Sequence, residues 1–367
     1  MSSILSRMAE QVRDAAAAAS PLRIAGGGSK DFYGHPVPGD TLDMRALSGI
    51  VDYEPSELVV TVLAGTPLAE LEAELAARGQ CLPFEPPHFG PGATVGGMVA
   101  AGLCGPARAS VGAVRDYVLG AQLLNGRGEL LDFGGQVMKN VAGYDVSRLL
   151  AGSLGTLGAI TRVSLKVLPV APAEATLRFA CDQDEALERL HGWGGQPLPL
   201  NASAWQLQDA ADAASGVLLL RLRGAVAAVQ AACARLGGNR TDTHDWAACR
   251  DQHLPWFATR AAGHDLWRLS VPQTAPVLCA DRADAFVEWH GGQRWYRVDA
   301  RDAGAAEALR RAAGDAGGHA TRFRCADPAA SDRFAPLSSA IARIHAGLKN
   351  SFDPAGVFNR GRLGAAL

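Results

Sequence analysis

The spacing of apolar and polar residues predicts a chain of alternating helices and strands. Leu22–Ala25 is a short apolar run that ends in three glycines, which is typical of a buried strand followed by a tight loop. In Gly158–Leu168 the apolar residues largely alternate with others, as expected for a strand with one buried face. The other expected strands are 50–53, 58–62, 117–124, 129–133, 175–181, 203–208, 216–221, 266–271 and 293–298, and the expected helices are 4–19, 66–78, 145–150, 184–193, 225–236, 303–313 and 335–352.

Local signals define two of these boundaries. Thr66-Pro67 predicts a helix start, with Thr66 as the N-cap and Pro67 at the first helical position. Asn125-Gly126 lies between two expected strands and predicts a hairpin.

Composition changes part-way along the chain and indicates two domains. All seven tryptophans follow residue 190, whereas the 42 glycines crowd in segments such as 90–105 and 126–158. The run Pro169–Ala175 breaks any regular element between them. The tryptophans are expected either at a protein interface, where this residue is enriched, or in a core. The expected domains are 1–172 and 173–318, followed by a C-terminal segment, 319–367, that returns to the first domain.

Charge and cysteine content exclude several functional classes. The formal net charge is −2 and both signs are evenly spread, so no basic surface for nucleic acid is expected. The longest uncharged apolar stretch, 95–105, is broken by glycines and is shorter than the about 20 residues of a membrane span. The N-terminal helix carries four charges, unlike a signal peptide. Seven cysteines without a Cys-x-x-Cys pair indicate reduced thiols in a cytosolic protein.

The first motif with chemical content is Gly26-Gly27-Gly28-Ser29-Lys30, directly after the first expected strand. Three glycines let the backbone turn sharply and direct several N–H groups at one point, which is how a backbone nest holds phosphate. Ser29 and Lys30 add side-chain donors. The alternative is a plain tight loop. The motif lacks the G-x-G-x-x-G spacing, so a nicotinamide-binding Rossmann fold is not expected.

Two further glycine-rich segments follow. In Pro91–Gly102, Thr94 is placed to cap a short helix whose first turn contains Gly96 and Gly97, and a helix start with bare backbone binds anions. The alternative is a glycine-rich helix packed on a sheet. Downstream, Met138–Ser147 precedes the run Ala151–Ile160, whose spaced glycines would let a flat ring lie on the main chain. The alternative there is a loop between a helix and a strand.

These three segments, in this order, closely resemble the FAD-binding domain of the vanillyl-alcohol oxidase/p-cresol methylhydroxylase (PCMH-type) family. The closing Lys349–Leu363 is similar to that family's terminal F-D-P…N-P-G-R-L. The resemblance implies an α+β protein in which a PCMH-type FAD-binding domain with two subdomains is followed by a small α/β cap.

Three other runs, Cys81–Gly90, Val137–Asp145 and Gly317–Phe323, are similar to the E subunits of glycolate oxidases. This second resemblance implies an FAD-binding subunit that takes part in oxidising glycolate to glyoxylate. Its implied partners are the D subunit, which is a larger flavoprotein, and the F subunit, an iron–sulfur protein to which electrons pass through the flavin. The complex would be cytoplasmic, with association at the inner face of the membrane only through partners.

The resemblance also implies roles for particular residues. The first glycine loop, Gly26–Lys30, would hold the pyrophosphate. The residues Ala93, Thr94, Gly96 and Gly97 would support the pyrophosphate and ribityl chain. Backbone groups of Gly155, Gly158 and Ile160 would contact the isoalloxazine and the adenine side. Asn359 would close the pocket from the C-terminal segment. No catalytic residue is assigned. The implied cofactor-binding residues are Gly26, Gly27, Gly28, Ser29, Lys30, Gly92, Ala93, Thr94, Gly96, Gly97, Gly102, Gly155, Gly158, Ile160 and Asn359.

The departures from the family pattern carry their own predictions. No histidine lies in the first glycine loop, and Cys104 does not fit a cysteinyl attachment position, so FAD is expected to bind non-covalently. The G-H-x-G-D-G-N-x-H run of the family's 2-hydroxyacid dehydrogenases is missing, and His319 is the residue that comes nearest to matching it. No metal is therefore expected. This favours an accessory subunit. The alternatives are a self-sufficient FAD-dependent 2-hydroxyacid dehydrogenase of the D-lactate type and a scaffold without catalytic function.

The C-terminal part is locally basic. His319–Arg362 holds seven Lys and Arg against three Asp and Glu, and Arg322 and Arg324 would share one side of a strand. These arginines would steer an anionic substrate or balance the FAD pyrophosphate. The alternative is an ordinary solvated surface.

Overall fold

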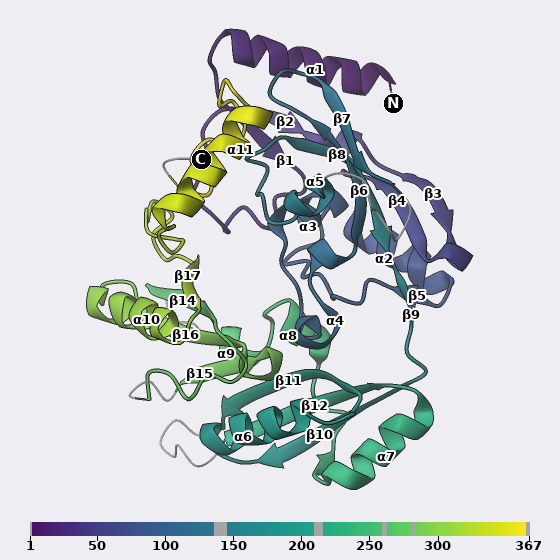
Figure 1. Cartoon of the computed structure of the whole chain (residues 1–367), viewed down its shortest axis with the longest axis vertical. Helices are drawn as coiled ribbons and strands as arrows, with labels where there is room; N and C mark the ends of the chain where they lie inside the picture. The colour runs from purple at the N-terminus through teal and green to yellow at the C-terminus, as the bar shows by residue number, and fades with distance from the viewer. Residues whose placement is uncertain (1, 136–144, 209–215, 259–262, 281–283, 365–367) are drawn as a thin grey trace. The chain divides into compact units, whose positions relative to one another are not determined.

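The computed structural model describes residues 2–135, 145–208, 216–258, 263–280 and 284–364 (Figure 1). The chain forms two compact units, and each is described by itself. The first unit contains residues 1–103, 113–170 and 336–367, and the second contains residues 104–112 and 171–335.

The first unit is built on a five-stranded antiparallel sheet of order β3-β4-β8-β6-β7. Beside it, β1 and β2 form a parallel pair in register Leu22↔Asp40. The strands of this unit are β1 Leu22–Ala25, β2 Asp40–Asp43, β3 Ile50–Glu54, β4 Val59–Leu63, β5 Gln80–Cys81, β6 Val118–Leu124, β7 Leu130–Gly134, β8 Ala159–Lys166 and β9 Leu168–Pro169. Its helices are α1 Ser2–Ala17, α2 Leu68–Ala77, α3 Val95–Ala101, α5 Val146–Leu149 and α11 Ser339–Phe352.

The C-terminal segment lies alongside β1, at the strand that leads into the first glycine motif. The Leu22 amide donates to the Val357 carbonyl at 2.7 Å, and the Asn359 amide donates to the Leu22 carbonyl at 3.0 Å. Val357 and Phe358 are fully buried, in a cluster that also contains residues of α1. Tertiary contacts between the two ends of the chain therefore hold β1 in place.

The second unit is built on an eight-stranded sheet of order β13-β10-β12-β11-β15-β16-β14-β17, in which every pairing is antiparallel. Its strands are β10 Ala173–Ala180, β11 Leu200–Leu207, β12 Gly216–Gly224, β13 Asn239–Arg240, β14 His264–Ser270, β15 Ala285–Glu288, β16 Gln293–Asp299 and β17 His319–Arg324. Its helices are α4 Arg108–Val111, α6 Gln183–Gly194, α7 Val226–Leu236, α8 Trp246–Arg250, α9 Pro255–Ala258 and α10 Ala303–Asp315.

The unit boundaries differ from the expected domain limits in two places. Strand β17 pairs with β14, so residues 319–335 stay with the second unit and the chain returns to the first at Pro336. Residues 104–112 also belong to the second unit, where the Trp289 indole donates to the Gly105 carbonyl at 3.0 Å. Both differences come from tertiary contacts that no local signal announces.

The expected elements are present at the expected places, with one wrong cap. Thr66 does not cap α2, because its hydroxyl donates to the Leu63 carbonyl at 2.7 Å and accepts from the Gly49 amide. Pro67 is the residue before the first helical position, and no described side chain caps α2. Edge strands too short for a sequence pattern, such as β5, β9 and β13, were not anticipated.

The tryptophans lie in the core of the second unit. Trp267 is fully buried, and five others are at most 8% exposed. Trp193 is partly buried against the same core. The core alternative is therefore the correct one, and these residues give no support to a partner interface.

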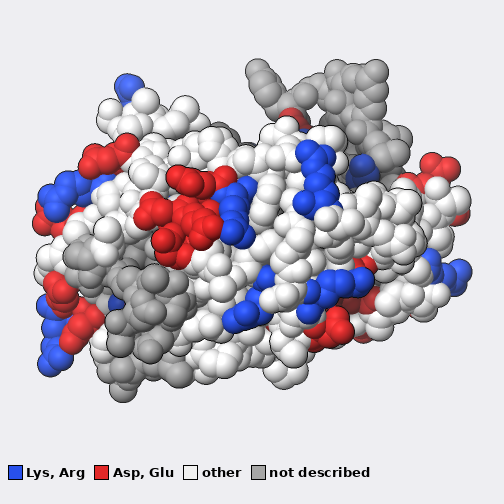
Figure 2. Space-filling view, turned by 90° about the horizontal axis from the view of Figure 1, so that it is seen from below, with Lys and Arg blue, Asp and Glu red and all other residues white. Residues whose placement is uncertain are grey.

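The face of the molecule drawn in Figure 2 carries no concentrated basic patch. In Figure 2 the basic and acidic side chains form small interspersed groups. Arg322 pairs with Asp265 at 2.5 Å and with Asp332 at 2.7 Å, so this arginine has two acidic partners in its own unit. Across the described residues, no helix is both long and apolar enough to cross a membrane.

Candidate cofactor site

The first glycine motif forms a tight loop directly after β1. Gly28 has a φ of +73°, and the Asp31 amide donates to the Gly28 carbonyl at 3.0 Å, which closes the turn. A Cβ on Gly27 would overlap the carbonyl oxygen of Gly92, so this loop packs backbone to backbone on the second glycine motif. Such a close approach requires glycine at position 27.

Four successive amides of this loop have no partner in the described protein. No described residue accepts a hydrogen bond from the N–H of Gly26, Gly27, Gly28 or Ser29. Successive unpaired N–H groups in a turn form a concave nest that suits an anion such as a phosphate group. The predicted phosphate loop therefore has the donors that its role requires.

The second glycine motif uses its donors within the protein. Thr94 is the N-cap of α3, as predicted, and its Oγ1 accepts from the Gly97 amide at 3.2 Å. The Gly96 amide donates to the Ala64 carbonyl at 2.7 Å. The unpaired donors therefore lie in the glycine loop and not at the start of α3, whose first turn serves as a wall without side chains.

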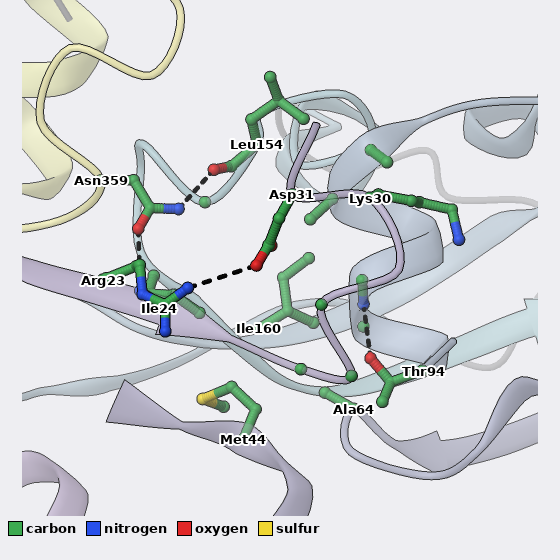
Figure 3. Close-up of a pocket in the computed structure, with 18 of the residues that line it drawn as sticks. Arg23, Ile24, Lys30, Asp31, Met44, Ala64, Thr94, Leu154, Ile160 and Asn359 are labelled. Carbon is green, nitrogen blue, oxygen red and sulfur yellow. Dashed lines mark hydrogen bonds and ion pairs between the residues drawn. The ribbon is translucent and has the colours of Figure 1, made fainter. Parts of the chain in front are cut away.

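A cavity within the first unit joins the motifs (Figure 3). Its empty space, counted out through the open mouth into solvent, is about 840 Å³. The predicted residues that line it are Gly26, Gly27, Gly28, Ser29, Lys30, Thr94, Gly96, Gly97, Gly155, Gly158, Ile160 and Asn359. The lining residues that sequence analysis missed are Arg23, Ile24, Asp31, Val37, Met44, Ala64, Ala100, Ala101, Leu154 and Arg362.

Three predicted site residues lie outside this lining. Gly92 supports the glycine loop from behind through its contact with Gly27. Ala93 is 2% exposed, and its carbonyl accepts from the first amide of α2. Gly102 ends α3 in the left-handed conformation, where a Cβ would lie 2.9 Å from the Gly152 backbone. These residues shape the walls of the cavity.

Asn359 joins the C-terminal segment to two walls of the cavity. Its Oδ1 accepts from the Ile24 amide at 2.8 Å, and its Nδ2 donates to the Leu154 carbonyl at 2.6 Å (Figure 3). Gly155 follows directly, and a Cβ there would lie 2.6 Å from the same amide nitrogen. The predicted closing role of Asn359 thus takes the form of a clip between β1 and the third glycine motif. Of that motif, Met138–Tyr144 lies outside the described residues.

A buried ion pair holds this C-terminal segment. Lys349 Nζ donates to Asp353 at 2.7 Å and to the carbonyls of Thr156 and Phe358 at 2.8 Å. Asp353 is 1% exposed and also accepts from the amides of Val357 and Phe358. Burial of Lys349 lowers its pKa below the usual value, although Asp353 acts in the opposite direction. The terminal motif therefore anchors the third glycine motif through Lys349.

The charged lining is mainly cationic. The lining contains three cationic side chains, those of Arg23, Lys30 and Arg362, and one carboxylate, that of Asp31. Arg362 donates to the carbonyls of His35, Lys30 and Asp31 at 3.0–3.3 Å and so braces the outer part of the glycine loop. Lys30 Nζ lies 3.3 Å from the His88 carbonyl. This excess of positive charge, beside the unpaired amides, favours an anionic ligand.

Two of the lining residues that sequence analysis missed lie next to motifs that it recognised. Arg23 immediately precedes the glycine loop, and Arg362 lies in the terminal motif beside Asn359. Met44 and Ala64 carried no signal in the sequence, because they reach the cavity from β-strand connections that lie apart from every motif.

The lining residues fit FAD. The amide nest and the cations suit a diphosphate, and the glycine and alanine walls leave room for flat rings. The described lining includes no histidine or cysteine, and non-covalent binding stays a prediction. No cluster of His, Cys, Asp and Glu suited to a metal ion occurs among the residues that the structure describes.

Comparison with known proteins identifies the family. The chain is 45% identical over 358 residues to the glycolate oxidase subunit GlcE of Escherichia coli, covering 98% of this chain and 97% of that protein. The chain belongs to the GlcE family. Residues 6–134 match the family described as FAD binding domain, so the protein carries an FAD-binding domain and FAD is its cofactor.

More distant relatives match less than half of this chain. A mitochondrial D-lactate dehydrogenase [cytochrome] of Arabidopsis thaliana is 32% identical over 165 residues, 44% of this chain and 29% of that protein. The glycolate oxidase subunit GlcD of Bacillus subtilis is 30% identical over 139 residues, 38% of this chain and 29% of that protein. Both alignments are shorter than half of this GlcE-family chain.

The fold is also shared with a solved protein of low sequence identity. A solved alkyldihydroxyacetonephosphate synthase matches with a TM-score of 0.69 at 16% identity, covering 96% of this chain and 74% of that one. The predicted α+β fold with a PCMH-type FAD-binding domain is confirmed.

Proposed function

We propose that this GlcE-family chain is the FAD-binding subunit of a multi-subunit glycolate oxidase. In that complex it takes part in the oxidation of glycolate to glyoxylate and passes electrons through its flavin to an iron–sulfur partner. The observation that carries the proposal is the cavity of the first unit, in which an amide nest and three cations meet, in a chain 45% identical to a glycolate oxidase subunit.

The chain's own residues would bind and orient the cofactor in this function. FAD supplies the redox chemistry, because its ring system accepts two electrons and releases them singly. The nest of Gly26–Ser29 would hold the diphosphate, and Asn359 would keep the adjoining walls together. The bare first turn of α3, at Gly96 and Gly97, leaves room beside the cofactor.

An accessory role is favoured over self-sufficient oxidation of substrate. Removing a proton from a 2-hydroxyacid calls for a base such as histidine or an ionised carboxylate within reach of the reacting atoms. The described lining offers one carboxylate, that of Asp31, and it is paired with Arg23 at 3.3 Å. The partners that would complete the reaction are a flavoprotein of the GlcD type and an iron–sulfur protein.

The test compares the chain alone with the chain co-expressed with those two partners. The isolated chain should show a bound-flavin absorption band that glycolate and D-lactate leave unchanged. The co-purified complex should lose that band when glycolate is added without an acceptor. Bleaching of the isolated chain would establish the self-sufficient dehydrogenase instead. A chain that co-purifies without any flavin would establish the scaffold, and elution as a free monomer at micromolar concentration would refute the partnership.

A further inference from the structure

One ion pair at the cavity has a geometry that sets it apart from ordinary surface pairs. Arg23 Nη1 lies 3.3 Å from Asp31 Oδ2, and Arg23 Nη2 lies 3.2 Å from Thr41 Oγ1. Both charged residues line the cavity, and Figure 3 shows the pair reaching from β1 to the loop that follows the glycines. The side chains are 38% and 59% exposed, so solvent reaches both.

The Asp31 carboxylate also covers the glycine turn. A Cβ placed on Gly28 would lie 3.4 Å from Asp31 Oδ2, so the carboxylate lies on the side of the turn to which that Cβ would point. The carboxylate accepts no hydrogen bond from those amides. A negative charge, that of Asp31, therefore lies at the rim of a nest that suits an anion. It lies next to the Arg23 guanidinium.

We propose that Arg23 binds the diphosphate of FAD and that Asp31 competes with the diphosphate for the Arg23 guanidinium. The inference rests on the proposed assignment of this cavity as the FAD site. An anion on the amides of Gly26–Ser29 comes within reach of the same guanidinium that Asp31 contacts. Asp31 thus lowers the affinity for the cofactor by holding the Arg23 guanidinium.

The chemistry favours this exchange of partners. An exposed ion pair with one contact at 3.3 Å is weak, because solvent screens it and ordering two long side chains is costly. A guanidinium binds phosphate oxygens through charge-assisted hydrogen bonds that are shorter and stronger than neutral ones. Thr41 already holds one Nη atom of Arg23, which keeps the guanidinium near the cavity when Asp31 is released.

The experiment is a double-mutant cycle on FAD affinity. The full chain is stripped of flavin, and FAD is titrated by its fluorescence for wild type, Arg23→Met, Asp31→Asn and the double variant. Asp31→Asn should tighten binding several-fold, and Arg23→Met should weaken it at least tenfold. In the Arg23→Met background, Asp31→Asn should have little effect. Inorganic pyrophosphate, used as a competitor, should follow the same order of affinities.

The matched control is the pair Arg162 and Asp132, also in the first unit. These residues are 2.8 Å apart, with side chains 35% and 62% exposed, and neither lines the cavity. Arg162→Met and Asp132→Asn should leave FAD affinity unchanged. An equal change in the control pair would show a general charge effect and would overturn the proposal.

The remaining outcomes are equally distinct. A gain from Asp31→Asn that is as large in the Arg23→Met background would mean repulsion alone and would refute competition. Weaker binding by Asp31→Asn would mean that the carboxylate supports the loop, which also refutes it. Ala100→Trp, which fills the cavity, tests the site assignment separately. If this variant binds FAD normally, the cavity is not the FAD site. If Ala100→Trp abolishes FAD binding but the Arg23 and Asp31 variants do not show the expected affinities, the site assignment holds. Only the proposed competition between Asp31 and the diphosphate is then refuted.

Discussion

Gly97→Val separates a role in cofactor binding from a role in packing. Gly97 lines the cavity in the first turn of α3, and a Cβ at this position would lie 3.0 Å from Thr94 Oγ1. The substitution therefore crowds the helix cap, which should cost about 1 kcal/mol of folding stability. The valine methyl groups extend from a position on the cavity wall and should exclude the cofactor.

The stabilisation by bound FAD, which Gly97→Val should remove, can be estimated. A ligand at a hundredfold excess over its dissociation constant stabilises the folded state by about 2.7 kcal/mol. For a unit of this size, that corresponds to a rise of roughly 5–10 °C in Tm, since about 1 kcal/mol shifts Tm by about 2–4 °C. Wild type should show this rise when FAD is added, and Gly97→Val should show none.

The assay is thermal unfolding of flavin-free protein with and without excess FAD. The control is Gly347→Val, because Gly347 lies in α11 and a Cβ there would meet no described atom within 4 Å outside its chain neighbours and the backbone of its own helix. That variant should keep the full FAD-dependent rise. If Gly97→Val melts earlier than wild type but still gains roughly 5–10 °C with FAD, by the same estimate, Gly97 serves packing alone and the reasoning is wrong.

Three further predictions concern anchoring, pH and attachment. Lys349→Met should lower the free energy of unfolding by about 3–5 kcal/mol, because Asp353 stays buried without its partner, and Lys349→Met/Asp353→Asn should recover part of it in urea titrations. Burial lowers the pKa of His290 to about 4. The unfolded chain then binds more protons between about pH 4 and pH 6.5, so stability should fall as the pH drops through that window, and His290→Gln should flatten the pH dependence in acid unfolding. Acid precipitation should release all flavin into the supernatant, and colour in the washed pellet would contradict non-covalent binding.

Local signals in the sequence determined much of the fold and the position of the cofactor loop. Thr94 caps α3 and Asp145 caps α5, because a short polar side chain beside a helix start bonds the nearest free amides wherever the chain goes. The three glycines after β1 form the expected turn, because glycine allows the positive φ of Gly28 and the close approach of Gly27 to the Gly92 backbone. Twelve of the fifteen predicted site residues line one cavity.

Tertiary structure decided which backbone N–H groups in these motifs stay unpaired and can bind a ligand. Gly96 and Gly97 looked like bare donors, yet Ala64 and Thr94 accept their hydrogen bonds, and Ala64 comes from a distant strand end. Asn125-Gly126 does form the hairpin turn, but Gly128 has the positive φ, and a Cβ on Gly126 would overlap Asp353.

The same holds for charge and burial. Arg23 and Asp31 are eight residues apart, and only the turn of the glycine loop brings their side chains together over it. The tryptophans, equally suited to an interface or a core, are buried because eight antiparallel strands meet around them. A sequence specifies which groups a segment offers, whereas the partners that satisfy them arrive from elsewhere in the chain, and only the folded structure determines which donors and charges remain for a ligand.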